Sequence, residues 1–188
     1  MHNDYAVSQK VVHWLMSFLI ILDLFVANKF GGAMEDWDRL ESRSDHATVG
    51  TIVLCLFLYR LYLRYKHGAP PVPDSMTGWQ VTAARWAHTL LYVLIGFLIC
   101  TGILTGINAT SEIQIFGQLT LSSGQTDDAT FLFLRPFHEF ATNAIIALIV
   151  LHIIAALYHE LVKRDRTLIK MLKFWHREPL SGSSNEQA

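Results

Sequence analysis

Two histidines in one strongly apolar stretch, His138 and His152, are the residues of this sequence whose type and spacing best suit metal chemistry. They lie fourteen residues apart. At about 100° per residue, fourteen steps fall roughly 40° short of four full turns, so both imidazoles project from nearly one helix face. Their separation along the axis is about 21 Å, most of the way across a hydrocarbon layer of roughly 30 Å. One helix would therefore present an imidazole near each side of a membrane.

The histidine-bearing stretch is one of four apolar segments long enough to cross a membrane. The chain of 188 residues is 52% hydrophobic and only 16% charged, well below the usual quarter. Residues 144–156 are apolar nearly all round, whereas a helix of a soluble bundle would be amphipathic. The segments span residues 11–27, 47–63, 83–107 and 137–158. We therefore expect an all-α fold, an integral membrane four-helix bundle.

The charges between these segments predict how the bundle is oriented. The loop between the second and third segments and the stretch after the fourth are rich in Arg and Lys, whereas the other two loops are acidic. The positive-inside rule then places that basic loop and both the N- and C-termini in the cytoplasm. Topology and attraction to the lipid bilayer explain these basic residues, so no nucleic acid partner is expected.

The connecting segments indicate a single domain. Residues 1–178 are predicted to form the four-helix domain, and residues 179–188 a short disordered tail. The proline-rich stretch 68–73 ends the second helix and makes a stiff connector. The longest loop, 108–135, contains a predicted turn at 122–125 and could cap the outer face of the bundle.

Placed by depth, the histidines fall at two levels. His46 opens the second segment at the outer side, level with His138. At the inner side, His152 is level with both His13 and His88, and geometry alone does not choose between these two as its partner. Ionisable groups are costly inside a membrane and usually functional, so matched levels favour ligation.

Paired imidazoles at one depth suit the iron of a haem, which accepts two trans nitrogen ligands from facing helices. A structural zinc site would instead need four ligands converging on one point, and these rings are spread over two levels. The sequence has no Cys-x-x-Cys-His, so a haem would be held without thioether bonds. The pattern therefore predicts two haem b groups.

Other polar residues are weaker candidates for a role at the site. Arg60 and Arg85 could pair with the propionates of an inner haem, although membrane topology explains them more simply. Asp23, inside the first segment, should face the bundle interior or water, and a hydrogen-bonded structural role is favoured over proton transfer. The glycines of the third segment fit either close helix packing or space for a flat macrocycle.

Between residues 7 and 172 the chain resembles the bacterial cytochrome b561 family. The same core is similar to the cytochrome b subunits of membrane-bound hydrogenases and formate dehydrogenases. The resemblance is carried by a set of short motifs in a fixed order, together with the fourteen-residue interval between His138 and His152. Its members are His13-Trp14, His46, the stretch RLYLRYK at 60–66 followed by Pro70-Pro71, His88, His138-Glu139, His152 and Tyr158-His159.

The resemblance implies axial ligands from the first, second and fourth helices. It pairs His13 with His152 at the inner side and His46 with His138 at the outer side. It leaves other residues as candidates for contact with a ligand or a quinone. These are His88, His159, Arg60 and Arg85.

A haem with two histidine ligands has no open position, so it should pass electrons rather than bind oxygen. The resemblance implies a location in the bacterial inner membrane and ubiquinone or ubiquinol as one partner. In part of the family, superoxide is oxidised at the outer face and its electron passes to quinone, but the acidic outer loops would repel that anion.

Two other functions compete with a superoxide oxidase-like enzyme. The protein could be a relay subunit for a periplasmic redox protein that docks on the acidic outer loops. It could also be a proton-coupled transporter, but the chain has no internal repeat of the kind such transporters use.

Overall fold

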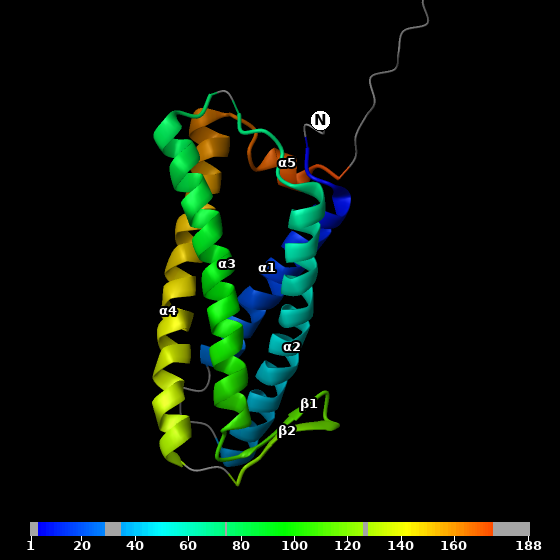
Figure 1. The fold of residues 1–188 in the computed structure, drawn as a ribbon, viewed down its shortest axis with the longest axis vertical. Coiled ribbons are helices and arrows are strands. Elements are labelled where there is room, and N and C mark those ends of the chain that lie inside the picture. The colour runs from blue at the N-terminus through cyan, green and yellow to red at the C-terminus, as the bar shows by residue number, and fades with distance from the viewer. Residues whose placement is uncertain (1–3, 29–34, 74, 126–127, 175–188) are drawn as a thin grey trace, which may run out of the picture.

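The computed structural model describes residues 4–28, 35–73, 75–125 and 128–174, where the chain forms four long helices and a small β-hairpin (Figure 1). The long helices are α1 (Val7–Asn28), α2 (Asp36–His67), α3 (Gly78–Ile107) and α4 (Asp128–Tyr158). A π-helical turn, η2 (His159–Lys163), continues α4, and the short α5 (Ile169–Leu172) follows. All four long helices are apolar enough to cross a membrane, which confirms the predicted four-helix membrane bundle. The predicted tail, 179–188, lies outside the described residues.

All four long helices begin earlier than hydropathy predicts, and α1 begins at Val7 rather than at residue 11. α2 begins at Asp36 rather than at residue 47, and α4 begins at Asp128 rather than at residue 137. The stretch added to α2 is polar, so a search for apolar runs passes over it. The stretch added to α4 is apolar at residues 131–134 but is separated from the main apolar run by Arg135 and Pro136. α3 begins at Gly78, where the Gln80 side chain accepts a hydrogen bond from the Thr77 N–H at 3.0 Å, as in a capping box.

The helices are arranged as two closely packed pairs, α1 with α2 and α3 with α4, while α2 and α3 meet less extensively. The start of α1 and the whole of α5 lie at one end of the bundle, and the hairpin lies at the other (Figure 1). We call these the α5 end and the hairpin end. Because both ends of the described chain lie at the α5 end, the structure agrees with two termini on one side. The assignment of that side to the cytoplasm stays a prediction.

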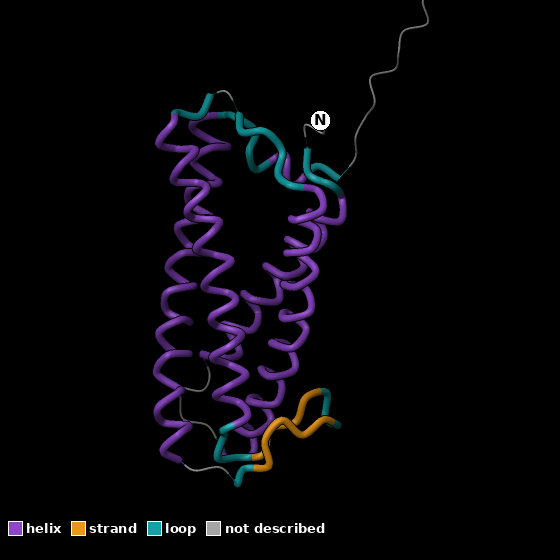
Figure 2. Tube along the Cα trace, viewed as in Figure 1, coloured by secondary structure: helices purple, strands orange, loops and turns teal. Residues whose placement is uncertain are grey.

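The hairpin lies within the long loop for which the sequence predicts no strand (Figure 2). Strands β1 (Glu112–Ile115) and β2 (Leu119–Ser123) pair antiparallel and pack on α2. Hydroxyls of α2 accept hydrogen bonds from the hairpin backbone, Ser44 from Gln114 at 3.2 Å and Thr48 from Phe116 at 3.0 Å. The turn predicted at 122–125 is wrong in part, because Ser122 and Ser123 complete β2.

The apolar core lies midway between the two predicted histidine levels. All four long helices contribute to it, with Met16, Ile20, Val53, Phe57, Ile95 and Ile145. Ile145 is fully buried and lies seven residues from both His138 and His152. A water-excluding layer therefore separates the chemistry of the two ends.

Candidate metal centres

At the hairpin end, the structure brings His46 of α2 and His138 of α4 together. Their ring centroids lie 6.0 Å apart with the ring planes at 78°. Two trans metal–imidazole bonds of about 2 Å, with each centroid about 1 Å further out, would separate the centroids by about 6 Å. No group of three or more His, Cys, Asp or Glu side chains converges within the described ranges, as a structural zinc site would require. The pair fits two axial ligands of one iron.

Hydrogen bonds fix which nitrogen of each ring is available. The Thr101 hydroxyl donates to the Phe97 carbonyl at 2.8 Å, so at 3.2 Å its oxygen accepts the Nδ1–H of His138. Asp23 Oδ1 lies 2.9 Å from Nδ1 of His46, and a carboxylate only accepts. Both hydrogen bonds favour the tautomer with the proton on Nδ1, in which Nε2 is the nitrogen that can bind a metal.

Gly102 lets the His138 ring lie close to α3. A Cβ atom at this position would lie 3.0 Å from Cε1 of His138, a contact that would displace the ring. The other glycines of this face meet different neighbours, since Gly96 faces the Phe57 ring and Gly106 faces Leu121. The sequence left two roles open for these glycines, space for a macrocycle and close helix packing. Gly102 makes room for the His138 ring, whereas Gly96 and Gly106 allow close packing.

At the α5 end, the structure gathers three imidazoles around one level. The rings of His88 and His152 lie 5.4 Å apart, centroid to centroid. His13 lies close enough to interact electrostatically with both of them. Arg60 lies within electrostatic range of all three, so the structure brings this sequence candidate to the site.

Helix packing favours His13 as the partner of His152. His88 and His152 belong to the tightly packed α3–α4 pair, and packed helices lie about 8–10 Å apart, too close to admit a macrocycle between trans ligands. His13 belongs to the other helix pair and is half-buried, whereas His88 is exposed. Nδ1 of His88 donates to the Ala84 carbonyl at 2.7 Å, which holds the ring against its own helix. The pairing of His13 with His152 stays a prediction.

A second polar pair lies beyond His152 at the α5 end. His159 Nδ1 lies 2.5 Å from Oδ2 of Asp165, whose side chain is 1% exposed. The Thr167 backbone N–H and hydroxyl both donate to Oδ1 of the same carboxylate, at 3.1 and 2.6 Å. Burial alone would raise the pKa of Asp165, but the hydrogen bonds from Thr167 and His159 outweigh burial and lower it. The sequence singled out His159 but not its partner.

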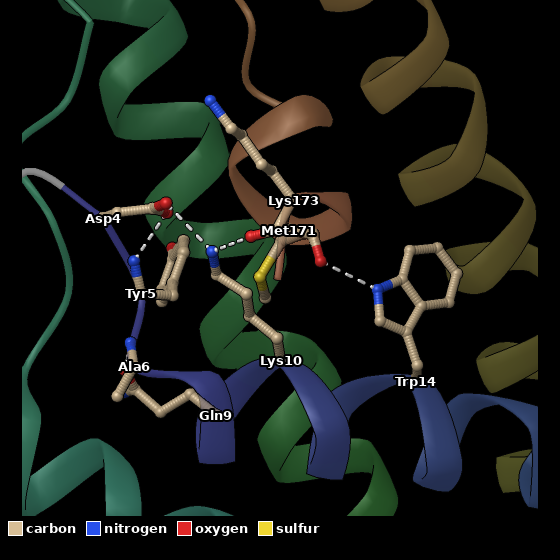
Figure 3. A network of polar contacts seen from close by, with 8 residues as sticks. All are labelled: Asp4, Tyr5, Ala6, Gln9, Lys10, Trp14, Met171 and Lys173. Carbon is tan, nitrogen blue, oxygen red and sulfur yellow. Dashed lines mark hydrogen bonds and ion pairs between the residues drawn. The ribbon is translucent and has the colours of Figure 1, made fainter. Parts of the chain in front are cut away.

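The start of α1 is tied to α5 by a polar network (Figure 3). The buried Lys10 ammonium donates to Asp4 Oδ2 at 2.9 Å and to the Lys173 carbonyl at 2.5 Å. The Trp14 indole donates to the Met171 carbonyl at 3.0 Å. Lys10 lies three residues before His13, so the network fixes the part of α1 that carries this histidine.

Tyr5 also lies at the α5 end, and the sequence analysis missed it. Burial raises the pKa of its hydroxyl, although nearby Arg64 and Arg60 oppose the rise. The phenol is therefore a neutral hydrogen-bond donor beside two cations. By contrast, Arg85 lies exposed on α3 and lines a shallow hollow with Trp86.

The hairpin end carries basic side chains as well as the acids that the sequence predicts there. The guanidinium of Arg43 lies within electrostatic range of Arg39 and Arg135. Arg43 and Arg135 each precede a histidine of the hairpin-end pair by three residues, about one helical turn. Acidic side chains line a different hollow, of about 420 Å³, between α2 and the hairpin; they are Glu41, Asp45 and Glu112. Arg135 is itself paired with Glu139, Nε to Oε1 at 2.6 Å, so cations and acids lie together beside the histidine pair.

A membrane-spanning four-helix bundle with imidazoles from facing helices at two levels belongs to the class of membrane cytochromes. The family model for prokaryotic cytochrome b561 matches residues 4–174, and the chain belongs to this family. It is thus a multi-pass inner-membrane protein that binds haem b and transfers electrons. Family membership confirms the predicted resemblance. It also disfavours the alternative prediction of a proton-coupled transporter.

Curated relatives match nearly the whole chain. A probable superoxide oxidase CybB of Yersinia pestis is 26% identical over 172 residues, covering 92% of this chain and 97% of that protein. Cytochrome b561 homolog 1 of Escherichia coli is 25% identical, covering 90% and 97%. A cytochrome b562 of Cereibacter sphaeroides is 28% identical, covering 90% and 95%.

Proposed function

We propose that this protein carries electrons across the inner membrane through two haem b groups. His46 and His138 hold one at the hairpin end, and His13 and His152 hold the other at the α5 end. The observation that carries the proposal is the 6.0 Å pairing of the His46 and His138 rings, with both Nδ1 atoms engaged by protein acceptors. A haem bound by two imidazoles supplies one-electron transfer without an open coordination position.

Quinone exchanges electrons at the α5 end in this proposal. Reduction of ubiquinone consumes two electrons and two protons, so the site needs a proton donor. His159 lies seven residues beyond His152, about 10 Å along the helix. The Asp165 carboxylate accepts a hydrogen bond from Nδ1 of this ring and orients it, and in this proposal Nε2 passes a proton to a quinone oxygen.

Superoxide is the proposed electron donor at the hairpin end. Arg43, with Arg39 in electrostatic range, attracts an anion to the surface next to the His46–His138 pair, while Arg135 is paired with Glu139 at 2.6 Å. Two superoxide anions lose one electron each and leave as two molecules of oxygen, which balances one quinone reduced to quinol. The similarity to the probable superoxide oxidase of Yersinia pestis supports this assignment.

A relay subunit is the second candidate, favoured by the acidic hollow between α2 and the hairpin. Glu41, Asp45 and Glu112 would attract a basic periplasmic redox protein to this surface. Such a partner would deliver electrons to the same histidine pair in place of superoxide.

The first test is a reduced-minus-oxidised absorption spectrum of the detergent-purified protein, with haem quantified against protein. We expect a b-type α-band and two haems per chain. Enzymatically generated superoxide should then reduce the protein, and a short-chain ubiquinone should reoxidise it. A single haem per chain would contradict the two-site arrangement, and a colourless protein would contradict the whole proposal. Reduction by a basic cytochrome but not by superoxide would favour the relay.

Replacing His159 or Asp165 should slow the quinone step alone. In His159→Gln and Asp165→Asn we expect reoxidation by ubiquinone to fall by about 10²–10⁴-fold in stopped flow, the usual contribution of a positioned proton donor. The haem spectrum and reduction by superoxide should not change. Glu160→Gln, which alters the half-buried neighbouring acid, is the matched control. Equal slowing in the control would show that His159 and Asp165 have no special part in the quinone step.

A further inference from the structure

Asp23 makes a direct contact with one of the two histidines at the hairpin end. Its Oδ1 lies 2.9 Å from Nδ1 of His46, although Asp23 comes from α1 and His46 from α2. The two side chains are 15% and 28% exposed, so water screens the contact only in part. Asp23 also lies within electrostatic range of His138. A carboxylate inside an apolar helix is energetically costly, and the contact with His46 offsets part of that cost.

Two other imidazoles near the proposed haem sites, those of His138 and His88, have neutral acceptors. His138 donates its Nδ1–H to the Thr101 hydroxyl, and His88 donates to the Ala84 carbonyl. At the α5 end the nearby charge has the opposite sign, because Arg60 lies within range of His13 and His152. The contact made directly with His46 is therefore anionic, whereas His13 and His152 have a cation within electrostatic range.

The charge of the acceptor changes what the ring offers to a metal. A carboxylate that accepts the Nδ1–H shifts electron density toward Nε2, makes it a more basic ligand and fixes the orientation of the ring. A more basic axial ligand stabilises ferric over ferrous iron and so lowers the reduction potential. A neutral hydroxyl or carbonyl acceptor has a weaker effect of the same kind.

We propose that Asp23 is a positioning residue that acts through His46 to lower the reduction potential of the hairpin-end haem. Electrons then pass more favourably from the iron at the hairpin end, which is oxidised, to the iron at the α5 end, which is reduced. No proton moves in this step. The inference rests on the proposed ligation by His46, and it gives the electron path a built-in preference for one direction.

The test is an equilibrium redox titration of purified Asp23→Asn beside the unaltered protein. Asparagine keeps the shape and a weak acceptor but removes the charge. We expect the hairpin-end component to titrate at a higher potential and the α5-end component to stay unchanged. The low-spin electron paramagnetic resonance signal of the oxidised hairpin-end haem should shift as well. His46→Ala, in which only the α5-end component remains, assigns the two components.

Asp45→Asn is the matched control. It removes one negative charge next to His46 in the chain, but from an exposed side chain. An equal rise in Asp45→Asn, a rise in both components of Asp23→Asn, or no rise at all would overturn the role of Asp23. If Asp23→Asn does not retain the hairpin-end haem, the titration is repeated with Asp23→Glu, which keeps the charge. In Asp23→Glu, a hairpin-end component at the potential of the unaltered protein supports the proposal. A raised potential or a missing haem in this variant contradicts it.

The same set of variants separates this inference from the proposed function. If His46→Ala keeps both haems, the ligation itself is wrong. If His46→Ala loses one haem but Asp23→Asn leaves every potential unchanged, the ligation stands and only the role of Asp23 fails.

Discussion

His46→Ala and His138→Ala should each abolish the haem at the hairpin end and leave the haem at the α5 end in place. Removing one of two trans imidazoles leaves a five-coordinate iron beside a small cavity, and the remaining ring cannot hold the haem through detergent purification. Haem per chain should therefore fall from about two to about one, and the redox titration should keep a single component. A pyridine haemochrome assay against protein concentration measures this loss.

Reduction by superoxide should disappear together with this haem, because the electron would lose its point of entry. The matched control is His67→Ala, which alters an exposed histidine in the last turn of α2, away from both pairs. Both haems should remain in the control. Two haems retained in either His46→Ala or His138→Ala would refute the hairpin-end pair. Loss of both haems would instead mean that the two sites fold as one unit.

The sequence was sufficient to predict the bundle because a bilayer imposes strong rules on any chain that crosses it. A helix that satisfies its own backbone must be long and apolar, and this determines four segments and their order. The same rule explains the errors at the boundaries. The first turns of α2, near Trp37, are helical without being apolar, so hydropathy does not detect them. In α4, Arg135 and Pro136 interrupt the apolar run and set the predicted start too late. The hairpin was missed because β1 has only four residues, too few for a periodic pattern.

The histidine levels were predictable for a related reason. Helical rise and period convert the fourteen-residue interval between His138 and His152 into a depth and a shared face. The acceptors of these rings were not predictable in the same way. Asp23 is twenty-three residues from His46, and Thr101 is thirty-seven from His138, so only the packing of different helices brings each pair together. Asp23 carried a signal, its cost in an apolar segment, but Thr101 carried none.

Surface charge is only partly predictable from the sequence. Counting acids and bases in the outer loops predicts a surface that repels superoxide. Helix period also places Arg43 and Arg135 one turn before the two histidines, but Arg135 is paired with Glu139 at 2.6 Å and three acids line the hollow beside the hairpin. Net charge of a loop is a poor guide to local potential when the loop folds back on a helix, because screening limits exposed charges to about 8–10 Å.

His13 and His88 are the two possible partners of His152 at the α5 end, and replacing them should have clearly different effects on haem content. We expect His13→Ala to lose the α5-end haem and His88→Ala to keep both haems. His13 and His152 lie on helices of different pairs, which leaves width for a macrocycle between them. His88 is held by the Ala84 carbonyl on a helix that packs directly against α4. The measurement is haem per chain and the number of components in a redox titration.

The two variants form their own matched control, since each removes one imidazole from the same cluster and the same local charge. A purely electrostatic or packing role would make both changes shift the α5-end potential without loss of haem. A ligand role must appear as loss in one variant only. If His88→Ala loses the haem and His13→Ala keeps it, then α3 and α4 must move apart to admit the macrocycle, and the packing argument is wrong. His152→Ala should lose this haem in either case, because His152 is the member of the cluster that both pairings share.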